Sequence, residues 1–131
     1  MDGLVSEGVS PITAQQMRSL AVDASVNVPI EQTWVWYEFD EGLPGRSLAG
    51  FFSIQVDDEP VAVMALERVQ KDGVEFLHTP NGPVWLVPQS AELELRVTDL
   101  IVSWAKKENP WAAFIRMQLA FEPQKTGEWA K

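Results

Sequence analysis

The feature that most constrains the fold is a series of three apolar segments joined by short turns. The segments are Leu48–Val56, Val61–Val69 and Val74–His78, each rich in residues that favour strands. Asp57–Pro60 separates the first two, and Lys71-Asp72-Gly73, with its strong Asp-Gly hairpin signal, separates the last two. Because connections this short cannot carry a crossover, neighbouring strands must run antiparallel. We therefore predict an antiparallel meander at the centre of the fold.

Helical patterns precede and follow this meander. A short strand at Val9–Ile12 leads into a helix that begins at Thr13, where the pairing with Gln16 is a capping-box pattern. A longer helix begins at Ser90 and ends before Asn109-Pro110, because a residue that precedes proline disfavours helix. The apolar positions of this longer helix fall on one stripe: Leu93, Val97, Leu100, Ile101 and Trp104.

The apolar segment Trp111–Met117 predicts a strand that returns to the sheet beside the meander. The order of elements predicts an α+β fold with a central mixed, mainly antiparallel sheet flanked by helices, which is an acetyltransferase-like (GNAT-like) layout. We expect residues 1–131 to form one such domain, because the length suffices for one hydrophobic core. Residues 1–8 are expected to be a loose N-terminus and residues 118–131 a tail.

Composition excludes several classes of function. Ten basic and 19 acidic residues give a net charge of -9, so autonomous nucleic-acid binding, which needs clustered cations, is not expected. The chain has no cysteine, which excludes disulfide and thiol chemistry. We predict a cytoplasmic protein without a membrane span, because the N-terminus lacks signal-peptide features and the longest apolar run, Val61–Leu66, is too short.

Aromatic residues concentrate in Pro29–Phe39, which reads PIEQTWVWYEF. Thr33 is a plausible N-cap, and Gly42 followed by Pro44 is a stop signal, so a short helix is expected between them. Two interpretations remain open. The rings are core anchors, or a ring of Trp34 or Tyr37 lines a pocket or stacks on a ligand.

No complete catalytic motif occurs in the chain. His78 is the single histidine and cannot make an ordinary zinc site, so we interpret it as structural or exposed. Nucleophile-elbow, P-loop and dinucleotide-binding glycine patterns are absent, as is the glycine-rich turn of acetyl-CoA enzymes. The acidic groups Asp40-Glu41, Asp57-Asp58-Glu59 and Glu92/Glu94 are explained by solvation or by the helix dipole. We therefore predict no metal and no cofactor, and identify no catalytic residue.

Several short motifs together resemble a known family. The string from Ile30 to Trp36, the turn Gly82-Pro83-Val84-Trp85 and the strand Ala113–Arg116 occur in order around two strands and a long helix. This arrangement resembles the first acetyltransferase-like domain of the FemA/FemB/FemX aminoacyltransferases. The matching positions are Gln32, Trp36, Gly82, Pro83 and Arg116. In place of the lysines that many members carry after the aromatic helix, this chain has Glu38, Asp40 and Glu41.

The resemblance implies a function in peptidoglycan synthesis. Members of the family transfer an amino acid from aminoacyl-tRNA to the stem peptide of the cell-wall precursor, and they contain a second domain that helps to form the active site. By this resemblance the chain would be inactive alone, with the precursor and aminoacyl-tRNA as partners. The residues expected to border the precursor are Trp36, Tyr37, Arg46, Asn81, Gly82 and Pro83. The catalytic positions are unknown.

Two other functions remain open on the sequence. A catalytically dead half would act as a binding or dimerisation module, forming a homodimer through an apolar surface that a second domain would otherwise cover. A small-molecule acetyltransferase is the third interpretation, and the missing glycine-rich pyrophosphate turn disfavours it.

Overall fold

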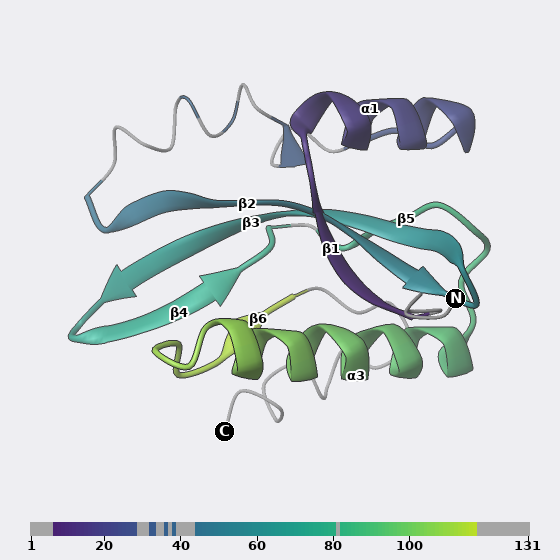
Figure 1. The fold of residues 1–131 in the computed structure, drawn as a ribbon. Coiled ribbons are helices and arrows are strands. Elements are labelled where there is room, and N and C mark those ends of the chain that lie inside the picture. The colour runs from purple at the N-terminus through teal and green to yellow at the C-terminus, as the bar shows by residue number, and fades with distance from the viewer. Residues whose placement is uncertain are drawn as a thin grey trace.

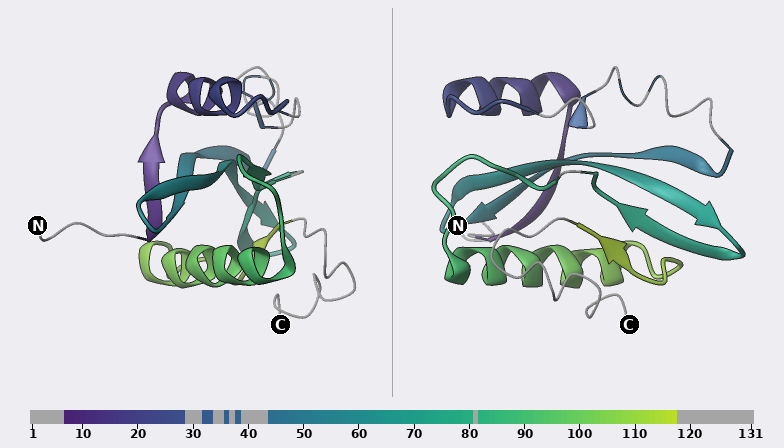
Figure 2. Two further views of the ribbon diagram at one scale, coloured as in Figure 1. Left: turned by 90° about the vertical axis from the view of Figure 1, so that its right-hand side faces the viewer. Right: turned by 180° about the vertical axis from the view of Figure 1, so that it is seen from behind.

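The computed structural model describes residues 7–28, 32–33, 36, 38, 44–80 and 82–117. Over these ranges the chain is an α+β domain in which an open mixed sheet lies between two helices (Figure 1). The views in Figure 2 show the layers: α1 (Ala14–Asp23) covers one face of the sheet and α3 (Ala91–Glu108) lies against the other. The predicted α+β class, with a mainly antiparallel sheet and flanking helices, is confirmed.

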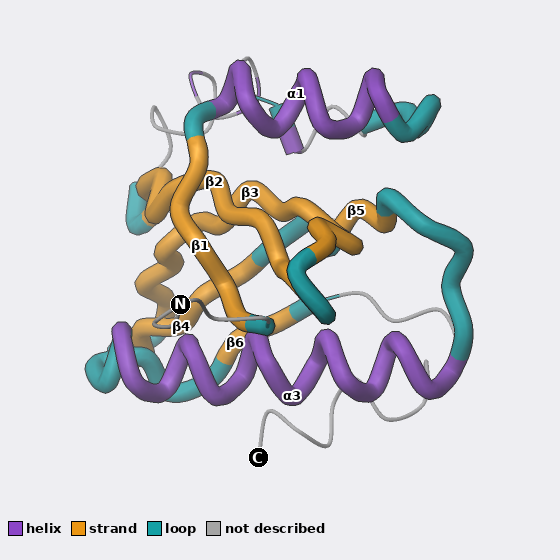
Figure 3. Tube along the Cα trace, turned by 45° about the vertical axis from the view of Figure 1, so that its right-hand side comes forward, coloured by secondary structure: helices purple, strands orange, loops and turns teal. Residues whose placement is uncertain are grey.

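The sheet has six strands in the order β1-β2-β3-β4-β6, and β5 pairs with β3 beyond the end of β4. Their bounds are β1 Gly8–Ile12, β2 Arg46–Val56, β3 Glu59–Lys71, β4 Val74–His78, β5 Val84–Trp85 and β6 Ile115–Arg116. Among the described pairs, β4 and β6 run parallel and the others antiparallel. Figure 3 shows that β1, the strand at one edge of the sheet, runs from the layer of α3 to the layer of α1.

The meander forms as predicted, with tighter turns. Asp57 and Asp58 have φ of 53° and 66°, and this pair of left-handed residues makes a two-residue hairpin whose twist suits the flanking strands. The predicted turn Asp57–Pro60 was too long, since Glu59 pairs with Val56 and Pro60 with Gln55. Asp72 and Gly73 make the second turn, with φ of 53° and 80°.

The helix starts predicted at Thr13 and Ser90 are confirmed at their caps. Thr13 Oγ1 accepts from the Gln16 N–H at 3.0 Å, and the Gln16 side chain accepts from the Thr13 N–H at 2.8 Å, which completes the capping box. Ser90 Oγ accepts from the Leu93 N–H at 3.1 Å and caps α3. The last turn of α3 ends at Asn109, whose N–H donates to the Ala105 carbonyl.

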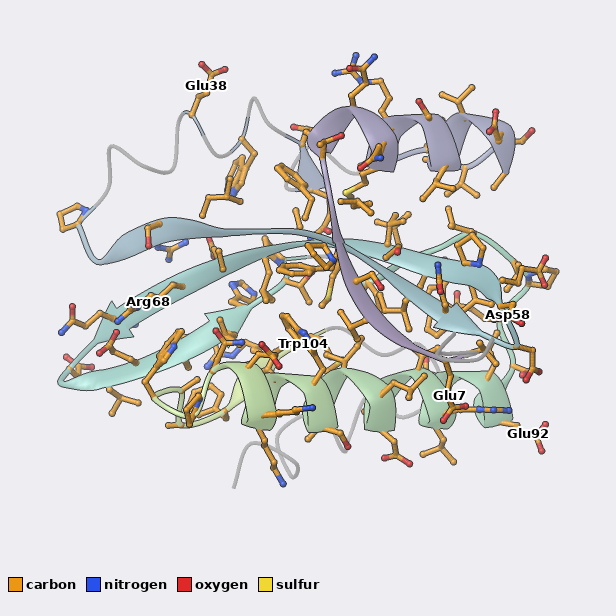
Figure 4. All side chains as sticks on the ribbon, viewed as in Figure 1. Glu7, Glu38, Asp58, Arg68, Glu92 and Trp104 are labelled. Carbon is orange, nitrogen blue, oxygen red and sulfur yellow. The ribbon has the colours of Figure 1, made fainter. Side chains whose placement is uncertain are left out.

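Each face of the sheet carries its own core. Ala62, Met64 and Leu66 of β3 pack with Val97 and Ile101 of α3. On the other face, the alternate β3 residues Val63 and Ala65 pack with Met17 of α1. Trp104 points from α3 toward the sheet (Figure 4), and its ring lies 4.7 Å from that of Phe52. Because β3 is buried on both faces, its sequence is a continuous apolar run rather than an alternating one.

Two predictions, one for the N-terminus and one for the last strand, need correction. Glu7 and Gly8 do not belong to a loose lead-in, since Gly8 begins β1 and Glu7 hydrogen-bonds to Arg96 on α3. The strand expected over Trp111–Met117 is reduced to Ile115–Arg116, because the preceding residues form a turn after α3 and Trp111 packs against Arg68. The tail predicted at residues 118–131 lies outside the described residues.

Candidate functional site

The centre of the candidate site is a place where β3 changes its neighbour. Glu67–Lys71 of β3 pair with β4, and Ala62–Val63 pair with β5, so none of the described strands pairs with the residues between them on that side. Gln32 fills this interval: its side-chain carbonyl accepts from the Ala65 N–H at 2.6 Å. The Gln32 side chain is 1% exposed, so it completes the hydrogen bonding of a buried strand in place of backbone.

The other end of the same amide holds the turn between β4 and β5. Gln32 Nε2 donates to Thr79 Oγ1 at 3.0 Å and also to the Pro80 carbonyl. Thr79 is buried, and its N–H donates to the Arg116 carbonyl on β6. A Cβ at Gly82 would lie 2.2 Å from Thr79 Oγ1 and 2.9 Å from Gln32 Nε2, so only glycine fits there. The Gly82–Pro83 bond is cis.

A buried acid lies beside this turn. Glu67 of β3 is 0% exposed, and its Oε1 lies 2.9 Å from His78 Nδ1, on the residue that pairs with it across the β3–β4 ladder. Arg46 of β2 places its guanidinium 3.6 Å from the same oxygen. A buried carboxylate is costly unless a cation and hydrogen bonds accompany it, and Arg46 and His78 supply both.

The other ion pairs in the described part of the chain lie on the surface. Arg68 pairs with Glu75 across the β3–β4 ladder, and Arg96 pairs with Glu7. The hydrogen bond to Glu7 raises the pKa of Arg96 above its usual value, but water screens such exposed pairs and they contribute little to stability. Glu67 therefore differs from them in its burial.

Basic and aromatic side chains continue the same sheet face at its edge. Arg116 of β6 pairs in register with His78, and its guanidinium lies 5.2 Å from the ring centroid of Phe76. Phe76 stacks on Phe114, with ring centroids 4.6 Å apart. Along β3, the backbone of Ala65 thus bonds to Gln32 and the side chain of Glu67, two residues later, bonds to His78.

The residues predicted from the resemblance fall into three groups. Gly82 and Pro83 are buried in the turn, with Gly82 against Gln32. Arg46 approaches Glu67, and Trp36 packs against the cluster that includes Phe51, Val63 and Ala65. Tyr37 and Asn81 lie outside the described residues, as do most of the residues of the predicted aromatic helix.

The described part of that helix agrees with its predicted start. Thr33 Oγ1 accepts from the Trp36 N–H at 3.4 Å, the bond expected of an N-cap. Glu38 is exposed, and its side chain points away from the sheet in Figure 4. It therefore adds no negative charge to the face that carries Glu67.

Sequence reasoning missed Glu67 and assigned His78 only a structural or exposed role. A signal was available: Glu67 interrupts the apolar run Val61–Val69 at a position that shares the face of Val63 and Ala65. Glu94 was also explained by solvation or the helix dipole, yet it is 2% exposed, and Gln89 Nε2 donates to its Oε2 at 3.3 Å. Solvation therefore does not explain Glu94, whereas its place in the first turn of α3 still suits the dipole.

Several hollows surround the domain. An open groove of about 510 Å³ runs between α1 and the β2–β3 hairpin, lined mainly by polar residues such as Gln16, Ser19 and Gln55. A smaller hollow of about 90 Å³ lies beside Gln32 and Thr33, and one of about 270 Å³ lies at the C-terminal end of α3. Over residues 7–117, within the described ranges, no group of three or more His, Asp or Glu side chains is arranged to hold a metal ion.

Comparison of the chain with protein-family models, with curated proteins and with solved structures found no match. In the described part of the chain, neither helix is long and apolar enough to cross a membrane.

Proposed function

We propose that this chain is the first acetyltransferase-like domain of an aminoacyltransferase of the FemA/FemB/FemX type. In this proposal the complete enzyme transfers an amino acid from aminoacyl-tRNA to an amine of the peptidoglycan precursor stem peptide. This domain binds the precursor and is inactive alone. The acetyltransferase-like (GNAT-like) identity of its sheet is part of the same proposal.

The observation that supports this proposal most is the contact between Gln32 and Gly82. These residues belong to two separate motifs of the resemblance, and the Cβ position of Gly82 lies 2.9 Å from Gln32 Nε2. Arg116 belongs to a third motif, and its carbonyl accepts a hydrogen bond from the N–H of Thr79. The side chain of the same threonine accepts a hydrogen bond from Gln32. Motif residues that meet around one buried amide have a shared structural reason to occur together.

The chemistry of the face suits positioning of a substrate rather than covalent catalysis. Bringing an amine against an activated ester supplies much of the rate enhancement in such a transfer. Arg46 has a side chain that is 40% exposed and could contact an anionic group of the precursor while it neutralises Glu67. Glu38 points away, which leaves the face without one of the carboxylates that would repel a diphosphate.

The decisive experiment is a calorimetric titration of the chain with the nucleotide-linked precursor. We expect saturable binding that Arg46→Gln weakens by about tenfold, the equivalent of roughly 1.4 kcal/mol. Trp36→Phe tests the aromatic contact, and Trp111→Phe is its matched control, since Trp111 lies on the opposite side of β3 beside Arg68. Circular dichroism establishes that each variant is folded.

Absence of binding by the folded wild-type chain would contradict the proposal. Sedimentation of the same sample then tests the alternative of a binding module, because a tight dimer would favour self-association through an apolar surface. A monomer that binds acetyl-CoA instead would favour the small-molecule acetyltransferase.

A further inference from the structure

We propose that His78 is the residue that accepts the proton of the attacking amine, and that Glu67 orients its ring. The inference rests on the proposed function, because it concerns the acceptor amine of that transfer. It adds a catalytic residue and a positioning residue that the resemblance does not identify. The juxtaposition that carries it is a buried carboxylate bonded to one nitrogen of a partly exposed imidazole.

The geometry determines which ring nitrogen can act. In this proposal Glu67 is an ionised partner of Arg46 that only accepts hydrogen bonds, so the 2.9 Å contact with Glu67 Oε1 assigns the proton of the neutral ring to Nδ1. Nε2 then keeps its lone pair. Among the described residues, none hydrogen-bonds to Nε2, and the His78 side chain is 25% exposed, so a substrate amine can reach it.

The burial of Glu67 indicates that the pair has more than a packing role. Glu67 lies in an otherwise largely apolar strand. At such a buried position, an aliphatic residue of similar size often makes the fold as stable as a buried ion pair does, or more stable. Its neighbours Ala65 and Val69 on the same face are buried aliphatics. A carboxylate at this position loses hydration, and what it gains is a fixed orientation of the His78 ring.

The charged groups around His78 come from three strands. Glu67 faces it from β3, Arg46 approaches the same carboxylate oxygen from β2, and Arg116 pairs in register with His78 from β6. Arg46 and Arg116 bring positive charge to this face, which suits an anionic substrate group.

The proposed step is balanced in atoms and charge. The neutral amine nitrogen attacks the ester carbon of the aminoacyl donor, and its proton passes to His78 Nε2 as the C–N bond forms. The C–O bond to the ribose then breaks, and the imidazolium returns that proton to the departing ribose oxygen. The products are an amide and a free hydroxyl, and His78 is neutral again. General base catalysis of this kind contributes about 10²–10⁴-fold to a rate.

The first test reads the tautomer of His78 and needs no activity. Because the chain has a single histidine, ¹⁵N-histidine labelling gives one pair of imidazole nitrogen signals in the whole protein. We expect the neutral ring to be protonated at Nδ1, and Glu67→Leu, which removes the acceptor, to shift it to the Nε2–H form. A wild-type ring protonated at Nε2 would overturn the inference, whatever the outcome for the proposed function.

The second test is transfer of an amino acid from charged tRNA to the precursor. The chain is added to a lysate of its source organism that lacks this gene product, so that the lysate supplies any further component that the proposed transfer needs. We expect His78→Gln and Glu67→Leu, both folded by circular dichroism, to slow transfer by about 100-fold while precursor binding changes little. Added imidazole should restore part of the rate of His78→Ala and none of that of Arg46→Gln.

The outcomes separate the two proposals. Transfer by His78→Gln at the wild-type rate overturns the role of His78 and leaves the proposed function intact. A wild-type chain that neither binds precursor nor supports transfer overturns both, even if His78 has the Nδ1–H tautomer. Loss of transfer in Glu67→Leu without a change of tautomer would remove Glu67 from its orienting role.

Discussion

The side-chain carbonyl of Gln32 accepts a hydrogen bond from the backbone N–H of Ala65 at 2.6 Å, across 33 residues of sequence. The bond satisfies a backbone N–H of β3 in the interval between the residues that pair with β4 and those that pair with β5. The same amide also donates to Thr79, so one buried side chain connects the segment before β2, the central strand and the Gly-Pro turn. Removal of the Gln32 side chain should therefore lower the free energy of unfolding by more than the loss of one small buried group would.

We predict that Gln32→Ala lowers the free energy of unfolding by about 1–3 kcal/mol, because it leaves the buried Ala65 N–H without an acceptor. Urea denaturation measures the difference. Gln15→Ala is the matched control: Gln15 is exposed on α1, and we expect a change within about 0.5 kcal/mol. Equal effects of the two substitutions would show that the Gln32 amide is not structural.

Gly82→Ala should destabilise the domain by about 1–3 kcal/mol through overpacking against Thr79. The new methyl group would lie 2.2 Å from Thr79 Oγ1. Gly73→Ala separates crowding from backbone strain, since nothing lies within 4 Å of its Cβ position and only its φ of 80° is unfavourable. A double-mutant cycle of Gly82→Ala with Thr79→Ala should be non-additive, and additivity would contradict the contact.

The core between the sheet and α3 predicts that substitutions at buried and exposed positions of α3 differ strongly in their effect on stability. Ile101 is 0% exposed between α3 and β3, so Ile101→Ala should cost about 2–5 kcal/mol. Leu95 lies on the same helix but is 57% exposed, and Leu95→Ala should change stability by less than about 0.5 kcal/mol. Thermal and urea unfolding of both variants give the comparison. A costly Leu95→Ala would reveal a contact of this exposed residue that the present packing does not contain.

The hairpin turn between β2 and β3 carries a non-glycine residue in a left-handed conformation. Asp58 has φ of 66°, where glycine is unstrained, so Asp58→Gly should stabilise the domain by about 0.5–1 kcal/mol. Glu59→Gly, one residue later in extended β3, should instead destabilise it by about 0.5–1 kcal/mol. The melting temperatures should therefore move in opposite directions, and a shift in the same direction would contradict the turn geometry.

Much of the fold could be predicted from local signals. The meander followed from the apolar segments and the short turns predicted at Asp57–Pro60 and Lys71–Gly73, because connections this short permit only an antiparallel neighbour. The helix starts followed from Thr13 and Ser90, whose side chains bond to residues three positions away. The strand at Trp111–Met117 was predicted too long, since its apolar residues serve a turn and a contact with Arg68 rather than a ladder.

The candidate site was only partly predictable, since its contacts are distant in sequence. The resemblance gave Arg46, Gly82 and Pro83 as individual positions, and the structure adds that Gln32 and Thr79 surround Gly82. Glu67 could have been suspected from its place in an apolar strand, but its pairing with His78 depends on the register of β3 against β4. A shift of one residue in that register would place the two side chains on opposite faces.

The sequence by itself determined the class of fold, the helix caps, the positions of the two hairpins and the absence of cysteine chemistry, because each depends on residues within a few positions of one another or on composition. Only the tertiary structure decided that Gln32 completes the ladder of β3 and that Glu67 is buried against His78 and Arg46. These contacts join residues 11 to 33 positions apart, and they form only when sheet register and packing bring the strands together.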